Sequence, residues 1–132
     1  MGDTISSSKR RVLVVDDDPV IREVCCRLLE AGGFQVEDVE DGPSAIQRLQ
    51  QPADSPELVL LDMTMPGMNG VDVVVEMERL CLLHPVIITS GYSDDEVRER
   101  LPSDRVRGYL RKPYSFRELI DCVQSVIRET PA

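Results

Sequence analysis

Aspartates stand directly after two of the short apolar runs in this sequence. Asp16 and Asp17 follow the run at residues 12–15, and Asp62 follows the run at residues 58–61. Two carboxylates about 4 Å apart repel each other by ~4 kcal/mol at an effective dielectric constant of about 20. A hard divalent cation removes this penalty, and Mg²⁺ binds carboxylates together with water molecules. If the fold brings the three aspartates together, they predict a magnesium site.

A hydroxyl group and an ammonium group follow two later short segments that are expected to form strands. Ser90 comes after residues 86–89, and Lys112, one of only two lysines in the chain, comes after residues 106–110. Beside a carboxylate and Mg²⁺, these groups suit a phosphoryl group. The metal ion and the lysine neutralise its oxygens, the hydroxyl donates a hydrogen bond, and the carboxylate is the nucleophile. Each residue taken singly could be a solvated loop residue, but together they predict phosphoryl chemistry.

Apolar runs alternate with amphipathic stretches along the whole chain. Strands are predicted at residues 12–15, 34–39, 58–61, 86–89 and 106–110. Helices are predicted after the cap Asp18-Pro19, after Gly42-Pro43, at residues 71–83, from Ser93 to a limit at Pro102, and after Ser115. This alternation predicts a parallel sheet with helices on both faces, whose functional residues lie beyond the carboxyl ends of the strands. The aspartates, the serine and the lysine occupy these positions.

Two further expectations concern burial. The first helix is expected to bury one apolar face, made of Val20, Ile21, Val24, Cys25, Leu28 and Leu29. No two cysteines form a C-x-x-C pair, and one histidine leaves few partners for a zinc site. Buried, reduced thiols are therefore expected at Cys25, Cys26, Cys81 and Cys122.

The composition indicates one soluble domain. The 132 residues include 24 acidic and 15 basic side chains, and the net charge of −9 argues against binding to the phosphates of nucleic acids. A hydrophobic content of 42% argues against a disordered chain. No apolar run approaches the ~18 residues of a membrane span and no signal peptide opens the chain, so a cytoplasmic protein is expected. Residues 1–9 are expected to be a flexible end or a remnant of cloning, and residues 10–130 the domain.

Four segments of the sequence resemble the receiver domain of bacterial two-component response regulators. They are VLVVDDDP at residues 12–19, LVLLDMTMPGMNG at 58–70, PVIITSGYS at 85–93 and GYLRKPY at 108–114. Their order and spacing are specific, and the resemblance covers nearly the whole chain. It implies a flavodoxin-like (βα)5 fold, a doubly wound five-stranded parallel sheet in the order 2-1-3-4-5. SGYS together with KPYS also resembles the receivers attached to hybrid sensor histidine kinases.

The resemblance implies a role for each residue of the acidic site. Asp62 would be the phospho-acceptor, taking a phosphoryl group from a phosphohistidine. Asp16 and Asp17 would hold Mg²⁺ together with Asp62 and the backbone carbonyl of Thr64, and Lys112 would contact the phosphoryl group. The domain would then be a signalling phospho-acceptor whose only activities are this transfer and the later loss of its own phosphoryl group.

The resemblance also implies a switch and a set of partners. Ser90 would move toward the acyl phosphate, and Tyr109 would turn inward after it. These two movements would change the surface formed by the fourth helix, the fifth strand and the fifth helix. The implied partners are a histidine kinase or a histidine phosphotransfer domain, and a downstream protein or an output domain in the same chain. A phosphorylation-dependent dimer is also implied, without direct contact to nucleic acid or membrane.

Two alternatives compete with this interpretation. Haloacid-dehalogenase-like phosphatases share an acidic motif after the first strand, which here would make Asp16 the nucleophile and Asp18 the acid/base, with Ser90 and Lys112 in later motifs. That family needs further acidic metal ligands after another strand, and this sequence has no such ligands. The phosphatase interpretation also leaves Asp62 without a role. The second alternative is an interaction domain of receiver fold that works without phosphorylation. Such a domain is expected to lack residues of the acidic site, whereas this sequence contains all of them.

Overall fold

The computed structural model describes residues 9–91 and 104–129. Within these residues the structure has five strands: β1 (Arg11–Val15), β2 (Gln35–Val39), β3 (Leu58–Asp62), β4 (Val86–Ser90) and β5 (Val106–Arg111). Four helices are described: α2 (Pro19–Ala31), α3 (Gly42–Leu49), α4 (Gly70–Arg79) and α6 (Phe116–Glu129). The helix expected between Ser93 and Pro102, and the N-terminal residues 1–8, lie outside the described residues. No described helix has the length and apolar character that crossing a membrane requires.

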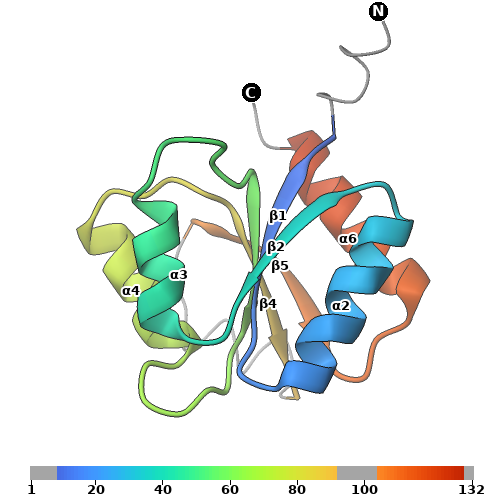
Figure 1. Ribbon diagram of the computed structural model, residues 1–132, viewed down its shortest axis with the longest axis horizontal. Helices are drawn as coiled ribbons and strands as arrows, with labels where there is room; N and C mark the ends of the chain where they lie inside the picture. Colours follow the sequence, from blue (N-terminus) through green and yellow to red (C-terminus); the bar gives the residue numbers. More distant parts are fainter. Residues whose placement is uncertain (1–8, 92–103, 130–132) are drawn as a thin grey trace, which may run out of the picture.

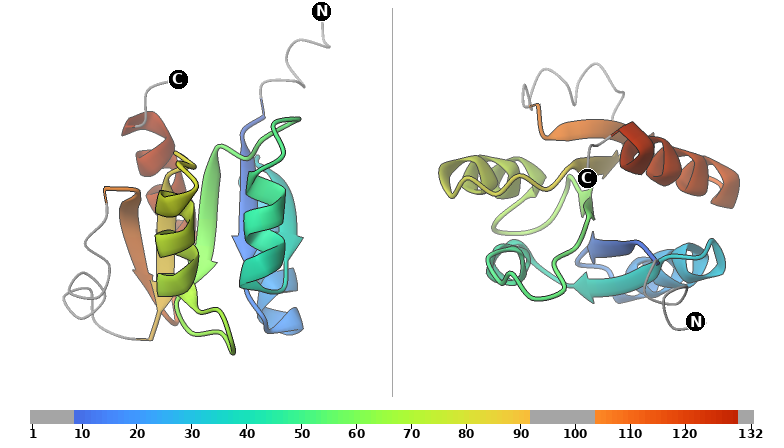
Figure 2. Two further views of the ribbon diagram at one scale, coloured as in Figure 1. Left: turned by 90° about the vertical axis from the view of Figure 1, so that its left-hand side faces the viewer. Right: turned by 90° about the horizontal axis from the view of Figure 1, so that it is seen from above.

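The strands form one parallel sheet in the order β2-β1-β3-β4-β5. Helices α3 and α4 cover one face, and α2 and α6 cover the other (Figure 1). Figure 2 shows both helical layers with the sheet between them. The expected doubly wound fold is therefore confirmed. Because the order changes direction between β1 and β3, the carboxyl ends of these two strands form the point where ligands bind in such sheets.

Alternate residues of the strands build two separate cores. On β1, Leu13 and Val15 pack toward α3 and α4, whereas Val12 and Val14 pack toward α2 and α6. All four side chains are almost fully buried. Strands buried on both faces need continuous apolar sequence, which explains the short runs without polar interruption. These cores hold the strand ends, and with them the polar residues that follow, at fixed positions.

The apolar face expected for α2 is only partly buried, which corrects that prediction. Cys25 and Leu29 are buried, but Val20, Ile21 and Val24 are exposed by 66%, 40% and 50%. Residues four apart lie one above the other on a helix, so Cys25 and Leu29 mark the line along which α2 meets the sheet. The apolar stripe of α2 is wider than this contact line, and the sequence pattern contains no information about which neighbours flank the helix.

Helix α4 ends at Arg79, four residues before the predicted end. Cys81 takes a left-handed conformation with φ of 58°. Its N–H donates to the carbonyl of Glu78, and the N–H of Leu82 donates to the carbonyl of Met77 at 2.9 Å. This is a Schellman ending, which usually has glycine where Cys81 stands, so the sequence carried no stop signal. Cys81 is exposed and Cys26 and Cys122 are only partly buried, so the expectation that all four cysteines are buried is wrong.

His84 lies in the loop before β4 with one ring nitrogen unsatisfied. Its Nε2 lies 2.9 Å from Oγ of Ser55, whereas its buried Nδ1 has no hydrogen-bond partner within the described part of the chain. Burial, and to a smaller extent the charge of Arg48, lower the pKa of His84 from its ordinary 6.5. A second proton would create a buried N–H without an acceptor, so the fold favours the neutral ring.

We expect the free energy of unfolding to fall as the pH drops below 6.5, the ordinary pKa of His84. The unfolded chain takes up the proton first, because the folded chain resists it until a lower pH, so acid favours unfolding. The slope due to one group is at most about 1.4 kcal/mol per pH unit. Urea denaturation at about pH 7.5 and about pH 5.5 measures the loss. His84→Gln is the control, and an equal loss in that variant would contradict the assignment to His84.

Candidate functional site

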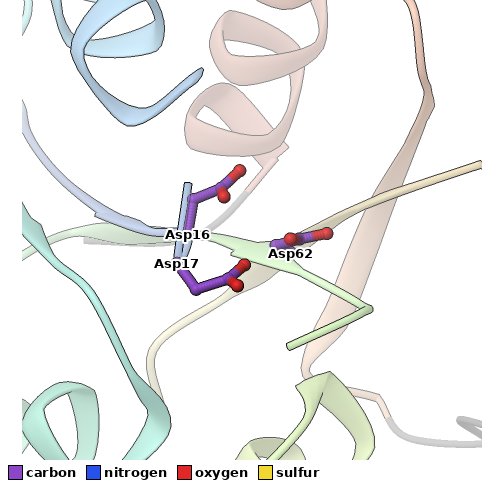
Figure 3. Close-up of side chains that lie close together, drawn as sticks. All are labelled: Asp16, Asp17 and Asp62. Atoms are coloured by element: carbon purple, nitrogen blue, oxygen red, sulfur yellow. The ribbon is translucent and has the colours of Figure 1, made fainter. Parts of the chain in front are cut away.

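Asp16 and Asp62 meet at the carboxyl edge of the sheet because their strands are paired. Val15 of β1 is in register with Leu61 of β3, so the two aspartates that follow these residues lie side by side. They are buried, with exposed fractions of 6% and 5%, whereas Asp17 is exposed. One carboxylate oxygen from each of the three lies within 4.8 Å of the others. Figure 3 shows these side chains gathered where β1 and β3 end.

Lys112 brings a positive charge between the two buried carboxylates. Its Nζ lies 3.2 Å from Oδ1 of Asp62 and 3.6 Å from Oδ2 of Asp16. Lys112 directly follows β5, and its backbone N–H donates to the carbonyl of Ser90 at 2.8 Å. The sheet therefore brings together residues separated by about a hundred positions of sequence, as the strand-end rule predicts.

Backbone N–H groups hold the two buried carboxylates in place. The N–H of Asp18 donates to Oδ1 of Asp16 at 2.9 Å, and the N–H of Thr64 donates to Oδ1 of Asp62 at 3.3 Å. The carboxylate of Asp18 itself accepts from the N–H groups of Val20 and Ile21 and so caps α2. This confirms the expected cap, and it leaves Asp18 engaged at the helix end, which counts against the acid/base role of the phosphatase alternative.

Clustering the carboxylates has an electrostatic cost at Asp62. Burial is the largest cause that raises the pKa of Asp62, and the neighbouring Asp16 raises it further. Lys112 and the N–H of Thr64 lower this pKa and offset part of the effect. One ammonium group among three carboxylates leaves a negative site. Its hard oxygen donors fit a divalent cation such as Mg²⁺.

Ser90 and Tyr109 lie on neighbouring strands beside the acidic site. Ser90 is buried and is the last residue of β4. Side chains alternate along a strand, so Ser90 faces the same side of the sheet as Ile88. Tyr109 is paired in register with Ile88 and packs against the core beneath α3 and α4, so both residues lie on that side. The structure thus places the two expected switch residues on one face of the sheet.

Two close contacts around the site have no counterpart in the sequence-based predictions. A Cβ on Gly70 would lie 2.9 Å from Cα of Met63 and 3.0 Å from the carbonyl oxygen of Asp62, so only glycine allows α4 to start this close to the site. The hydroxyl of Tyr114 contacts Sγ of Cys25 at 3.7 Å and attaches the segment after Lys112 to α2. The Asn69-Gly70 pair at the start of α4 is a turn signal that could have predicted the first contact, whereas the second contact links positions 89 residues apart.

The sequence matches the family described as response regulator receiver domain over residues 12–124. The phosphate regulon transcriptional regulatory protein PhoB of Escherichia coli K12 is 36% identical over 121 residues, which cover 90% of this chain and 52% of PhoB. Sensor kinase CckA of Brucella abortus is 29% identical over 126 residues, 93% of this chain and 13% of the kinase. The chain spans about half the length of PhoB and a small part of CckA.

Solved structures show the same fold. The response regulator TrrA of Thermotoga maritima, in complex with Mg²⁺ and BeF, superposes with a TM-score of 0.77 at 32% identity. The match covers 89% of this chain and 98% of TrrA.

Proposed function

This chain belongs to the response regulator receiver domains, the phospho-acceptor domains of two-component signalling, and we propose that Asp62 is the residue that carries the phosphoryl group. The observation that carries the proposal is that Asp62 lies beside Asp16 at the end of the sheet and that the ammonium group of Lys112 contacts both carboxylates, at 3.2 Å and 3.6 Å. Asp62 also sits at the strand end where ligands bind in such sheets. Receiver domains are signalling domains rather than classical enzymes, and they interact with histidine kinases.

In the proposed reaction an Oδ atom of Asp62 attacks the phosphorus atom of a phosphohistidine. The new O–P bond forms while the N–P bond breaks, and the imidazole leaves on the partner protein. The ammonium group of Lys112 neutralises the transferred oxygens, and the hydroxyl of Ser90 donates a hydrogen bond to one of them. The residues that would hold Mg²⁺ are Asp16, Asp17, Asp62 and the carbonyl of Thr64. When bound, the metal ion supplies positive charge to the phosphoryl oxygens.

The downstream part of the proposal concerns the signal. The movement of Ser90, followed by Tyr109, would change the surface that includes β5 and α6 and thereby a contact with an output partner. That partner is a separate protein or an output domain of the same protein, and phosphorylation-dependent dimerisation is one form of the contact. The similarity to a protein named a sensor kinase supports a receiver within a hybrid kinase, and the similarity to PhoB supports one within a regulator. We place the domain in the cytoplasm, where a receiver of a hybrid kinase and a receiver of a regulator would both act.

Phosphorylation by a small donor tests the proposal without a partner kinase. The protein is incubated with acetyl phosphate, with Mg²⁺ or with an excess of a chelator, and then treated with borohydride, which reduces an aspartyl phosphate to a stable homoserine. Peptide mass spectrometry is expected to find homoserine at position 62 only when Mg²⁺ is present. Reduction at Asp16 would support the phosphatase alternative, and no reduction at any aspartate would support the interaction-domain alternative.

A further inference from the structure

The guanidinium group of Arg22 ties the backbone of Asp16 to the neighbouring strand β2. Its Nη1 donates to the carbonyl oxygen of Asp16 at 2.8 Å, and its Nε donates to Oδ2 of Asp38 at 2.8 Å. Side chains on a helix point back toward its N-terminus, so Arg22 on α2 reaches the loop that enters the helix. Only 17% of its side chain is exposed. Arg22 therefore joins α2, β2 and the end of β1 at the acidic site.

The carbonyl that Arg22 holds belongs to the peptide group between Asp16 and Asp17. Because a peptide group is planar, fixing this oxygen also fixes the N–H of Asp17 and the direction in which its chain continues. The preceding N–H, that of Asp16, donates to the carbonyl of Val39 at 3.3 Å. Within the described residues the carboxylate of Asp17 has no hydrogen bond or ion pair, so its place depends on its backbone.

We propose that Arg22 is a positioning residue for the magnesium site, acting through the Asp16–Asp17 peptide group. By holding that peptide against β2, it keeps the carboxylates of Asp16 and Asp17 converging on that of Asp62. The inference rests on the proposed function, since it assigns a role toward the same metal ion. Charge alone would have the opposite effect, because a cation near the site repels Mg²⁺. The sign of the effect on Mg²⁺ affinity therefore separates positioning from charge.

The test compares Arg22→Gln with Arg27→Gln. Arg27 lies on the same helix and pairs with Glu23 at 2.7 Å, and 76% of its side chain is exposed. Both variants lose one positive charge, but only the first loses the bond to Asp16. Calorimetric titration with Mg²⁺ alone is expected to show about 10-fold weaker binding in Arg22→Gln, as for other residues that orient metal ligands. Arg27→Gln is expected to bind as the wild type does or slightly more tightly. Equal affinities in the two variants, or tighter binding in Arg22→Gln, would overturn the proposal.

A second pair of variants keeps the test valid if Arg22→Gln does not fold. Asp38→Asn removes the negative charge that anchors Arg22 and leaves the guanidinium group itself unchanged, and Glu23→Gln removes a matched acidic charge from an exposed pair. Asp38→Asn is expected to lose more Mg²⁺ affinity than Glu23→Gln, and equal losses would count against positioning. A wild-type protein that neither binds Mg²⁺ nor takes phosphate on Asp62 overturns the proposed function itself. If the wild type does both, a negative result in the variants overturns only the role of Arg22.

Discussion

Asp62→Asn is expected to abolish phosphoryl uptake from acetyl phosphate. The amide has nearly the shape of the carboxylate but lacks the negative oxygen that attacks phosphorus, so the fold is retained while the nucleophile is lost. The borohydride assay is expected to show no homoserine at any position. Asp18→Asn is the matched control because asparagine caps a helix as well as aspartate does, and this variant keeps the three site carboxylates. Uptake by Asp62→Asn at the wild-type level would show that another residue accepts the phosphoryl group.

The same substitution is expected to raise the melting temperature in buffer without Mg²⁺. Burial and the neighbouring Asp16 raise the pKa of Asp62 in the folded chain. A raised pKa means that the fold favours the uncharged form, so the ionised carboxylate destabilises the fold near neutral pH. Asparagine resembles the uncharged form and removes this cost. A lower melting temperature in Asp62→Asn, measured by circular dichroism, would show that the pairing with Lys112 outweighs the burial of the charge.

Lys112→Met is expected to slow phosphorylation by a factor of about 100 or more, because the transferred oxygens lose a fixed positive charge in a partly buried site. Methionine keeps much of the length of the lysine stem and its packing. The ammonium group also competes with a metal ion for Asp16 and Asp62. The affinity for Mg²⁺ is therefore expected to rise in Lys112→Met while the rate of phosphorylation falls.

Lys9→Met is the control for Lys112→Met, since it removes the only other lysine of the chain and leaves the same net charge. Lys9 is exposed and precedes β1, at the end of the sheet opposite to the acidic site. In this control, the rate of phosphorylation at saturating acetyl phosphate is expected to match that of the wild type. The affinity for Mg²⁺ is expected to match as well. Equal rates in the two lysine variants would mean that Lys112 has no part in the transfer.

Strand-end positions could be predicted because they depend on local sequence. Each buried strand needs a continuous apolar run, so the residue that follows a run marks the edge of the sheet. This rule located Asp16, Asp62 and Ser90, and the fifth predicted strand located Lys112 although it is not a continuous apolar run. The structure places all four residues at that edge. The caps at Asp18 and at Ser115 were predictable for the same reason, since their bonds reach only two or three residues along the chain.

By itself, the sequence determined the order of strands and helices, the residues of the acidic site and the family. These features are encoded by patterns within a few residues and by short motifs. Only the tertiary structure decided which apolar residues of α2 are exposed, where α4 ends, and that Arg22 joins Asp38 to the carbonyl of Asp16. Such outcomes depend on which elements become neighbours and on backbone atoms that no side-chain pattern describes. The contacts that hold the site residues in place could therefore be identified only from the tertiary structure.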